Sequence, residues 1–238
     1  MIPLLLARAL RMKRAIALAA AVMVTGALHA ANTSAAADNA AGVVHVINPE
    51  LLSALQNLKA TLPAGRTPLA FDNGASAKNC LEYSDLLSTS KPAESTRNFE
   101  IRSEYRLCDS IRIIAGKPFV AQKAAASGEQ GKTLYEKLDL RSFPSSLRNR
   151  TDASKRTLSA LLPGDVRSEG STVQVDTPEQ FFRLEVVGII DHGKGQAPEW
   201  IVWVTDQLKT GSYRGYSTLV VHPPRVASDL YTASPSPR

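Results

Sequence analysis

Apolar residues recur at helical spacing near the start of the predicted folded region. Asn48 and Pro49 suit a helix start, because asparagine caps a first turn and proline fits the first helical position. Pro63 stops the pattern. The intervening leucines are Leu51, Leu52, Leu55, Leu58 and Leu62. This spacing predicts an amphipathic helix with one side in the core, and a partner-binding helix is the alternative.

Three further short helices are predicted by the same spacing over residues 76–89, 133–140 and 153–162. Pro163 and Gly164 directly follow the last of them, and both residue types are typical of a helix end. The first of these helices carries Cys80, and the other two are expected to pack their leucines inward.

Residues 98–107 alternate apolar with charged side chains, which favours a half-buried strand. A helix that runs on through Ile114 is the alternative. Acidic and basic residues are mixed over 97–112, which indicates a solvated surface, with an anion- or wall-polymer-binding surface as the competing hypothesis. Residues 115–131 are expected to form a connecting loop.

The last third of the chain contains four segments that are rich in β-branched and aromatic residues, with turn residues between them. They are residues 171–175, 181–190, 200–205 and 213–222. The pattern predicts an antiparallel meander. Because helices come first and strands later, we expect an α+β fold in which N-terminal helices pack on a C-terminal β-meander of about four to five strands.

The N-terminus has the layout of a secretory signal peptide. Four basic residues between Arg8 and Arg14 precede an uncharged apolar run from Ala15 to Leu28, and small residues follow. That run is shorter than the roughly 20 residues needed to span a bilayer. We therefore predict a signal peptide, with a membrane anchor as the alternative and Met12 as a possible true start.

The remaining organisation follows from composition. We expect a signal peptide over 1–30, a flexible Ala-rich leader over 31–44, one globular domain over 45–226 and a disordered tail over 227–238. No membrane span is expected once the signal peptide is removed.

Removal of the signal peptide changes the charge of the protein. The whole chain has 28 basic and 22 acidic residues, a net charge of +6. The first 30 residues hold four of the basic residues and no acidic one, so 24 against 22 remain, a net charge of +2. This small excess argues against nucleic acid as a partner.

Two cysteines, Cys80 and Cys108, are present. In an exported protein an even number of cysteines favours a disulfide, and their spacing is unlike the C-x-x-C of redox pairs. Together with the signal peptide, this pattern predicts a periplasmic or secreted protein.

A polar stretch from Asp191 to Glu199 separates two predicted strands. It resembles a degenerate form of the Asp-rich loop of calcium-binding β-repeat proteins. Gly193 and Gly195 stand where such a loop needs oxygen ligands, and Lys194 brings a positive charge. We therefore expect a glycine-rich turn, no metal and no cofactor.

The histidines and carboxylates near this turn are candidates for chemistry. His192 and His222 can approach each other only if two strand ends meet, so we expect surface histidines. Asp191 lies before the predicted strand 200–205 and Asp206 lies after it. The two ends of such a strand are roughly 20 Å apart, so these two carboxylates are not expected to share one reaction centre.

Aromatic residues gather on one predicted hairpin. They are Trp200, Trp203, Tyr213 and Tyr216. Core packing explains such residues, and an exposed cluster would suit a protein–protein contact. These four residues are the candidate binding surface.

Two functional classes follow from these patterns. The first is an exported, non-catalytic protein that binds another protein or a cell-envelope component, such as an inhibitor or immunity-type protein. The second is an exported hydrolase with an active site near Asp191, His192 and Glu199. No catalytic motif singles out a nucleophile, so the first class is favoured and no catalytic residue is assigned.

Overall fold

The computed structural model describes residues 42–122, 129–164, 166–193 and 195–236. The predicted signal peptide and residues 31–41 of the predicted leader lie outside the described residues. All described residues belong to one compact unit that begins at Gly42.

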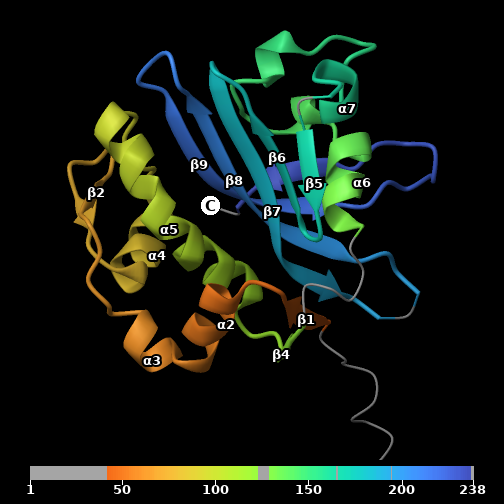
Figure 1. The fold of residues 1–238 in the computed structure, drawn as a ribbon. Coiled ribbons are helices and arrows are strands. Elements are labelled where there is room, and N and C mark those ends of the chain that lie inside the picture. Colours follow the sequence, from red (N-terminus) through yellow and green to blue (C-terminus); the bar gives the residue numbers. More distant parts are fainter. Residues whose placement is uncertain (1–41, 123–128, 165, 194, 237–238) are drawn as a thin grey trace, which may run out of the picture. The chain divides into compact units, whose positions relative to one another are not determined.

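An eight-stranded sheet forms the centre of this unit (Figure 1). Six strands follow one another in the order β10-β9-β8-β7-β1-β4, while β6 also pairs with β7, and β5 pairs with β6. Among the described strands of this sheet only β1 and β4 run parallel. The strands are β1 (Val43–Val46), β4 (Phe119–Ala121), β5 (Val166–Glu169), β6 (Thr172–Asp176), β7 (Gln180–Asp191), β8 (Glu199–Leu208), β9 (Arg214–His222) and β10 (Thr232–Pro235).

The predicted antiparallel meander is confirmed as β6, β7, β8 and β9, but the sheet has eight strands in place of the expected four to five. Two added strands come from segments that were expected to lack structure. Val43 and Val44 of the predicted leader belong to β1, and residues 232–235 of the predicted tail form β10 against β9. Both are strands of only four residues, and β1 pairs with β7, which lies far away in the sequence, so local pattern does not identify them.

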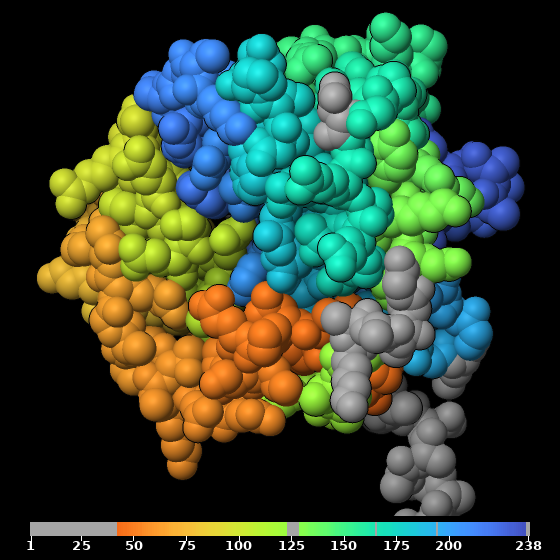
Figure 2. Space-filling view, viewed as in Figure 1, coloured from red at the N-terminus to blue at the C-terminus, as the bar shows by residue number. Residues whose placement is uncertain are grey.

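Helices lie on both sides of the sheet (Figure 1). One side carries α2 (Pro49–Gln56), α3 (Leu58–Thr61), α4 (Cys80–Leu87) and α5 (Thr96–Ile114), and the other carries α6 (Gln130–Lys137) and α7 (Leu158–Leu161). The expectation of N-terminal helices on one face is therefore wrong for α6 and α7, which follow β4 in the chain. In the space-filling view, the orange α2 and α3 segments and the yellow-green α5 segment form a continuous surface beside the strands (Figure 2).

Two cores result from the alternation of side chains along the central strands. In β8, Val202 and Val204 face the core that α6 and α7 cover, while Ile201 and Trp203 face the core that α2 and α5 cover. A third cluster joins α4, α5 and the small hairpin β2–β3 (Leu69–Ala70 and Ser76–Ala77). The sheet is thus buried on both faces, which explains the continuous apolar run of β8.

The segment 98–107 is part of helix α5, so the predicted strand is wrong. Ser95 caps the helix by accepting a hydrogen bond from the Asn98 backbone nitrogen at 3.1 Å. The helix is buried on two sides: Leu107 packs in the core beneath the sheet, and Ile101 packs in the α4–α5 cluster. A helix with two apolar sides lacks the single stripe that distinguishes a helix from a strand in sequence.

Helix α2 begins as expected, since Asn48 Oδ1 accepts from the Leu51 backbone nitrogen at 3.0 Å. The predicted single helix is interrupted at Asn57, whose backbone leaves the helical region, and α3 follows. The expected loop 115–131 contains β4.

Cys80 and Cys108 form a disulfide that joins α4 to α5, as predicted, with their Cα atoms 5.2 Å apart. Within the described part of the chain, no helix has the length and apolar character needed to cross a bilayer.

Candidate functional site

Four polar side chains meet where three neighbouring strands end. His192 directly follows β7, Glu199 is the first residue of β8, His222 is the last residue of β9, and Ser234 lies in β10. Antiparallel pairing brings the end of one strand beside the start of the next. We call these four residues the strand-end cluster.

Hydrogen bonds connect the strand-end cluster into one chain. The Ser234 hydroxyl oxygen lies 2.9 Å from His222 Nε2, and His222 Nδ1 lies 2.6 Å from Glu199 Oε1. The second carboxylate oxygen of Glu199, Oε2, lies 3.0 Å from His192 Nε2. A hydroxyl, an imidazole and a carboxylate in this order form the arrangement that activates a serine nucleophile.

The charge of Glu199 determines the direction of these hydrogen bonds. Burial would raise the pKa of Glu199, but its hydrogen bonds with His222 and His192 outweigh burial and hold that pKa below the usual range. An ionised carboxylate can only accept, so His222 must carry its proton on Nδ1. In neutral His222, Nε2 is then an acceptor for the Ser234 hydroxyl proton.

A pocket of about 440 Å³ opens beside the strand-end cluster. All four cluster residues line it. The other lining residues are three apolar side chains, Ile113, Ile190 and Val220, and two cationic ones, Arg112 and Lys117. The site therefore offers a cavity as well as a reactive group, and its volume lies within the range of small-ligand sites.

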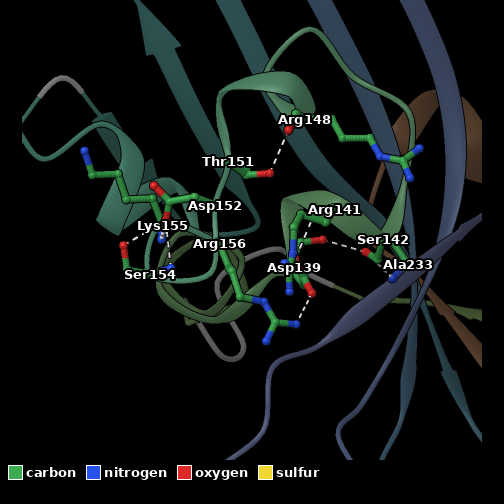
Figure 3. A network of polar contacts seen from close by, with 10 residues as sticks. All are labelled: Asp139, Arg141, Ser142, Arg148, Thr151, Asp152, Ser154, Lys155, Arg156 and Ala233. Atoms are coloured by element: carbon green, nitrogen blue, oxygen red, sulfur yellow. Dashed lines mark hydrogen bonds and ion pairs between the residues drawn. The ribbon is translucent and has the colours of Figure 1, made fainter.

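Strand β10, which carries Ser234, is held on both sides. On one side it pairs with β9, and on the other the Ala233 backbone nitrogen donates to Ser142 Oγ at 2.9 Å. Ser142 Oγ in turn donates to the Asp139 carbonyl oxygen at 2.6 Å (Figure 3). The Asp139 side chain pairs with Arg156, so a polar network fixes the neighbour of Ser234.

Asp139 is itself a strong anchor in this network. Burial would raise the pKa of Asp139, but hydrogen bonds from Arg156 and from the Arg141 backbone outweigh burial and lower that pKa. The Arg141 nitrogen lies 3.0 Å from Asp139 Oδ1. Asp139 is thus charged near neutral pH and holds the segment that supports β10.

Asp191, which was predicted near the active site, does not join the strand-end cluster through a hydrogen bond. Its Oδ1 accepts from the Gly193 backbone nitrogen at 2.8 Å and closes the turn that follows β7. Gly193 and Gly195 have φ angles of 65° and 74°, which glycine adopts without strain. Lys194 lies outside the described residues.

Asp206 lies at the opposite end of β8 and is buried. Burial raises the pKa of Asp206, while Ser146 donates to it from its hydroxyl and its backbone nitrogen, both at 2.6 Å. This aspartate stabilises the loop after α6 and is separate from the strand-end cluster.

The four aromatic residues of the candidate binding surface do not form one exposed patch. Trp200 is 8% exposed and stacks on Tyr231 in one core, whereas Trp203 is 7% exposed and lies in the other. Tyr213 donates to Asp206, and Tyr216 accepts a hydrogen bond from a glutamine. The two tryptophans thus point to opposite sides of the sheet.

A second pocket, of about 310 Å³, lies between α5 and the sheet. Its arginines are already engaged: Arg66 donates to the Glu104 carbonyl oxygen at 2.6 Å, and Arg106 donates to Thr205 Oγ1 at 3.0 Å. Arg106 also lies over the Trp203 ring. These contacts serve packing, so the strand-end cluster is the stronger candidate.

Among the described residues, no group of three or more histidine, cysteine, aspartate or glutamate side chains is arranged to hold a metal ion. The cluster histidines instead share the carboxylate of Glu199.

Sequence reasoning identified His192 and Glu199 but missed Ser234. Ser234 lies in a segment rich in serine and proline, which composition assigns to a tail. The one local sign in the sequence is Ala233 between the polar residues Thr232 and Ser234, and the structure buries Ala233 alone of the three. His222 was noted at a strand end, but the pairing that brings it to Glu199 depends on long-range register.

Comparisons of the chain with protein-family models, curated proteins and solved structures found no match.

Proposed function

We propose that the protein is an exported hydrolase that cleaves small esters. Ser234 is the nucleophile, His222 is the general base and Glu199 orients His222. The observation that carries this proposal is the hydrogen-bonded chain from Ser234 through His222 to Glu199 beside a pocket. Export is supported by the signal-like N-terminus and the disulfide, and both are compatible with a secreted protein.

The reaction proceeds in two acyl transfers. Ser234 Oγ attacks the ester carbonyl carbon while its proton moves to His222 Nε2, and a tetrahedral oxyanion forms. His222 then gives that proton to the departing alkoxide oxygen, the carbon–oxygen bond breaks, and an acyl-Ser234 ester remains. Water repeats the same steps, releasing the carboxylic acid and restoring the Ser234 hydroxyl.

Glu199 contributes by position and charge. Its ionised carboxylate holds the Nδ1 proton of His222 and stabilises the imidazolium that forms when His222 takes the serine proton. His192 donates to the other oxygen of Glu199 and is therefore a positioning residue, since it fixes the carboxylate that fixes His222.

The test is covalent labelling with a fluorophosphonate probe, which reacts with activated serines. We expect intact-mass measurement to show one added probe and peptide mapping to place it on Ser234. Ser234→Ala removes the label, and His222→Gln slows labelling by about 10²- to 10⁴-fold, the usual contribution of a general base. Ser236→Ala, two residues along the chain, is the matched control and keeps the wild-type labelling rate.

Labelling that persists in Ser234→Ala, or no labelling of the folded wild-type protein, contradicts the hydrolase proposal. A non-catalytic protein that binds another protein or a cell-envelope component is then the remaining proposal, and affinity capture with the exported protein tests it.

A further inference from the structure

We infer that the pocket selects small esters whose acyl part carries a second, anionic group, such as a carboxylate at the end of a short aliphatic chain. This inference rests on the proposed function and names the substrate class of the same site. The features that carry it are the charge balance of the pocket wall and the apolar character of the remaining lining.

The pocket has an excess of positive charge. Arg112 and Lys117 line it, and Glu199 is its one acidic lining residue among the described part of the chain. Both carboxylate oxygens of Glu199 already accept hydrogen bonds from histidines, so its charge is directed toward the strand-end cluster. The two cations are left to interact with a bound molecule.

Lys117 has hydrogen-bonding capacity to spare. Its ammonium group donates to the Ile113 carbonyl oxygen at 2.9 Å, at the end of α5. An ammonium has three protons, so two remain for other acceptors. Asp109 interacts electrostatically with Arg112 and partly balances its charge. We therefore take Lys117 as the main anion-binding group.

The apolar lining suits an aliphatic chain between the ester and the anion. Ile113, Ile190 and Val220 are 8%, 3% and 7% exposed, and together they present hydrocarbon at the pocket. An acyl chain that lies along them places its carbonyl near Ser234 and its far end near the cations. A neutral acyl chain leaves these cations without a partner, and sites that bind a polar group discriminate against analogues that lack it.

The experiment compares two chromogenic esters that share a leaving group, the mono-p-nitrophenyl ester of adipic acid and p-nitrophenyl hexanoate. The wild-type protein is expected to have a kcat/KM about 10- to 100-fold higher for the adipate ester, the range of one charge-assisted hydrogen bond. Lys117→Met removes the charge at similar length and is expected to abolish most of this preference, because kcat/KM falls more for the adipate ester than for the hexanoate ester. Lys59→Met, an exposed lysine on α3, is the control and retains the preference.

If Lys117→Met loses activity equally toward both esters, the inference is overturned. Lys117 would then stabilise the oxyanion or the fold and not a second anionic group, and the hydrolase proposal would stand. Equal hydrolysis of both esters by the wild-type protein also overturns it.

A binding measurement separates the inference from the hydrolase proposal. Calorimetric titration of Ser234→Ala with monomethyl adipate, which keeps the far carboxylate, and with the neutral ester methyl hexanoate needs no turnover. Monomethyl adipate binding that Lys117→Met weakens about tenfold or more supports the anion site even if the wild-type protein hydrolyses no ester. No preference for monomethyl adipate in Ser234→Ala overturns the inference even if the wild-type protein is a hydrolase.

Discussion

Asp109 on helix α5 is a carboxyl group whose ionisation is expected to oppose folding. Burial raises the pKa of Asp109 to about 6, although a hydrogen bond from Tyr83 and the positive charges of Arg102 and Arg112 act in the opposite direction. The Tyr83 hydroxyl lies 3.0 Å from Asp109 Oδ1. Asp109→Asn keeps an oxygen that can accept from Tyr83 and removes the charge.

The ordinary pKa of this group is 3.8, so the folded state binds the proton about two pH units more tightly than the unfolded state. Each pH unit corresponds to about 1.4 kcal/mol, so ionisation of Asp109 lowers the free energy of unfolding by at most about 3 kcal/mol. Relaxation and water penetration lower the effective penalty for a buried charge, so the expected effect on the free energy of unfolding is about 1–2 kcal/mol. Between pH 3.8 and about 6 only the folded state retains the proton, so rising pH removes stability across this window.

Asp109→Asn is therefore expected to raise the free energy of unfolding by about 1–2 kcal/mol at pH 8 and to leave it nearly unchanged at pH 4. Urea unfolding monitored by far-UV circular dichroism at several pH values measures this difference. Glu100→Gln, at an exposed position of the same helix, is the control. A variant that is destabilised at pH 8, or that differs from wild type equally at both pH values, refutes the reasoning.

Three further variants test how the fold is held together. Replacing both Cys80 and Cys108 by alanine is expected to lower the free energy of unfolding in urea by about 3–4 kcal/mol, the chain-entropy value for a loop of this length. Gly131→Ala places a Cβ 2.3 Å from the Thr172 carbonyl oxygen and is expected to lower the free energy of unfolding by about 1–3 kcal/mol. The thermal midpoint should fall, and an unchanged Tm would contradict this. Asp139→Asn is expected to lower the free energy of unfolding in urea by about 1–2 kcal/mol at pH 7. Because the pKa of Asp139 is lowered in the folded state, the carboxylate stabilises the fold only while it is ionised, so this difference should shrink as pH falls below the ordinary carboxyl pKa.

The strands of the meander were predictable because their β-branched and aromatic residues lie in unbroken runs with turns between them. Helix α5 was not, since Ile101 and Leu107 face different cores and their spacing fits a strand equally well. β1 and β10 have four residues each, and their identity as strands comes from partners ten or more residues away.

The strand-end cluster shows the same limit. His192 and Glu199 are seven positions apart, and the sequence already places them near one turn. His222 and Ser234 reach Glu199 only because β8, β9 and β10 are paired in one particular register. Sequence pattern can propose strands, but a one-residue change of register would turn these side chains to the opposite face.

The chain has two tryptophans, and the sheet separates them. Trp200→Phe leaves the indole of Trp203, which reports only on the layer under α2 and α5, and Trp203→Phe leaves that of Trp200, which reports only on the layer under α6 and α7. Fluorescence melting curves of the two variants would then show whether both layers of the protein come apart in a single cooperative step or one after the other.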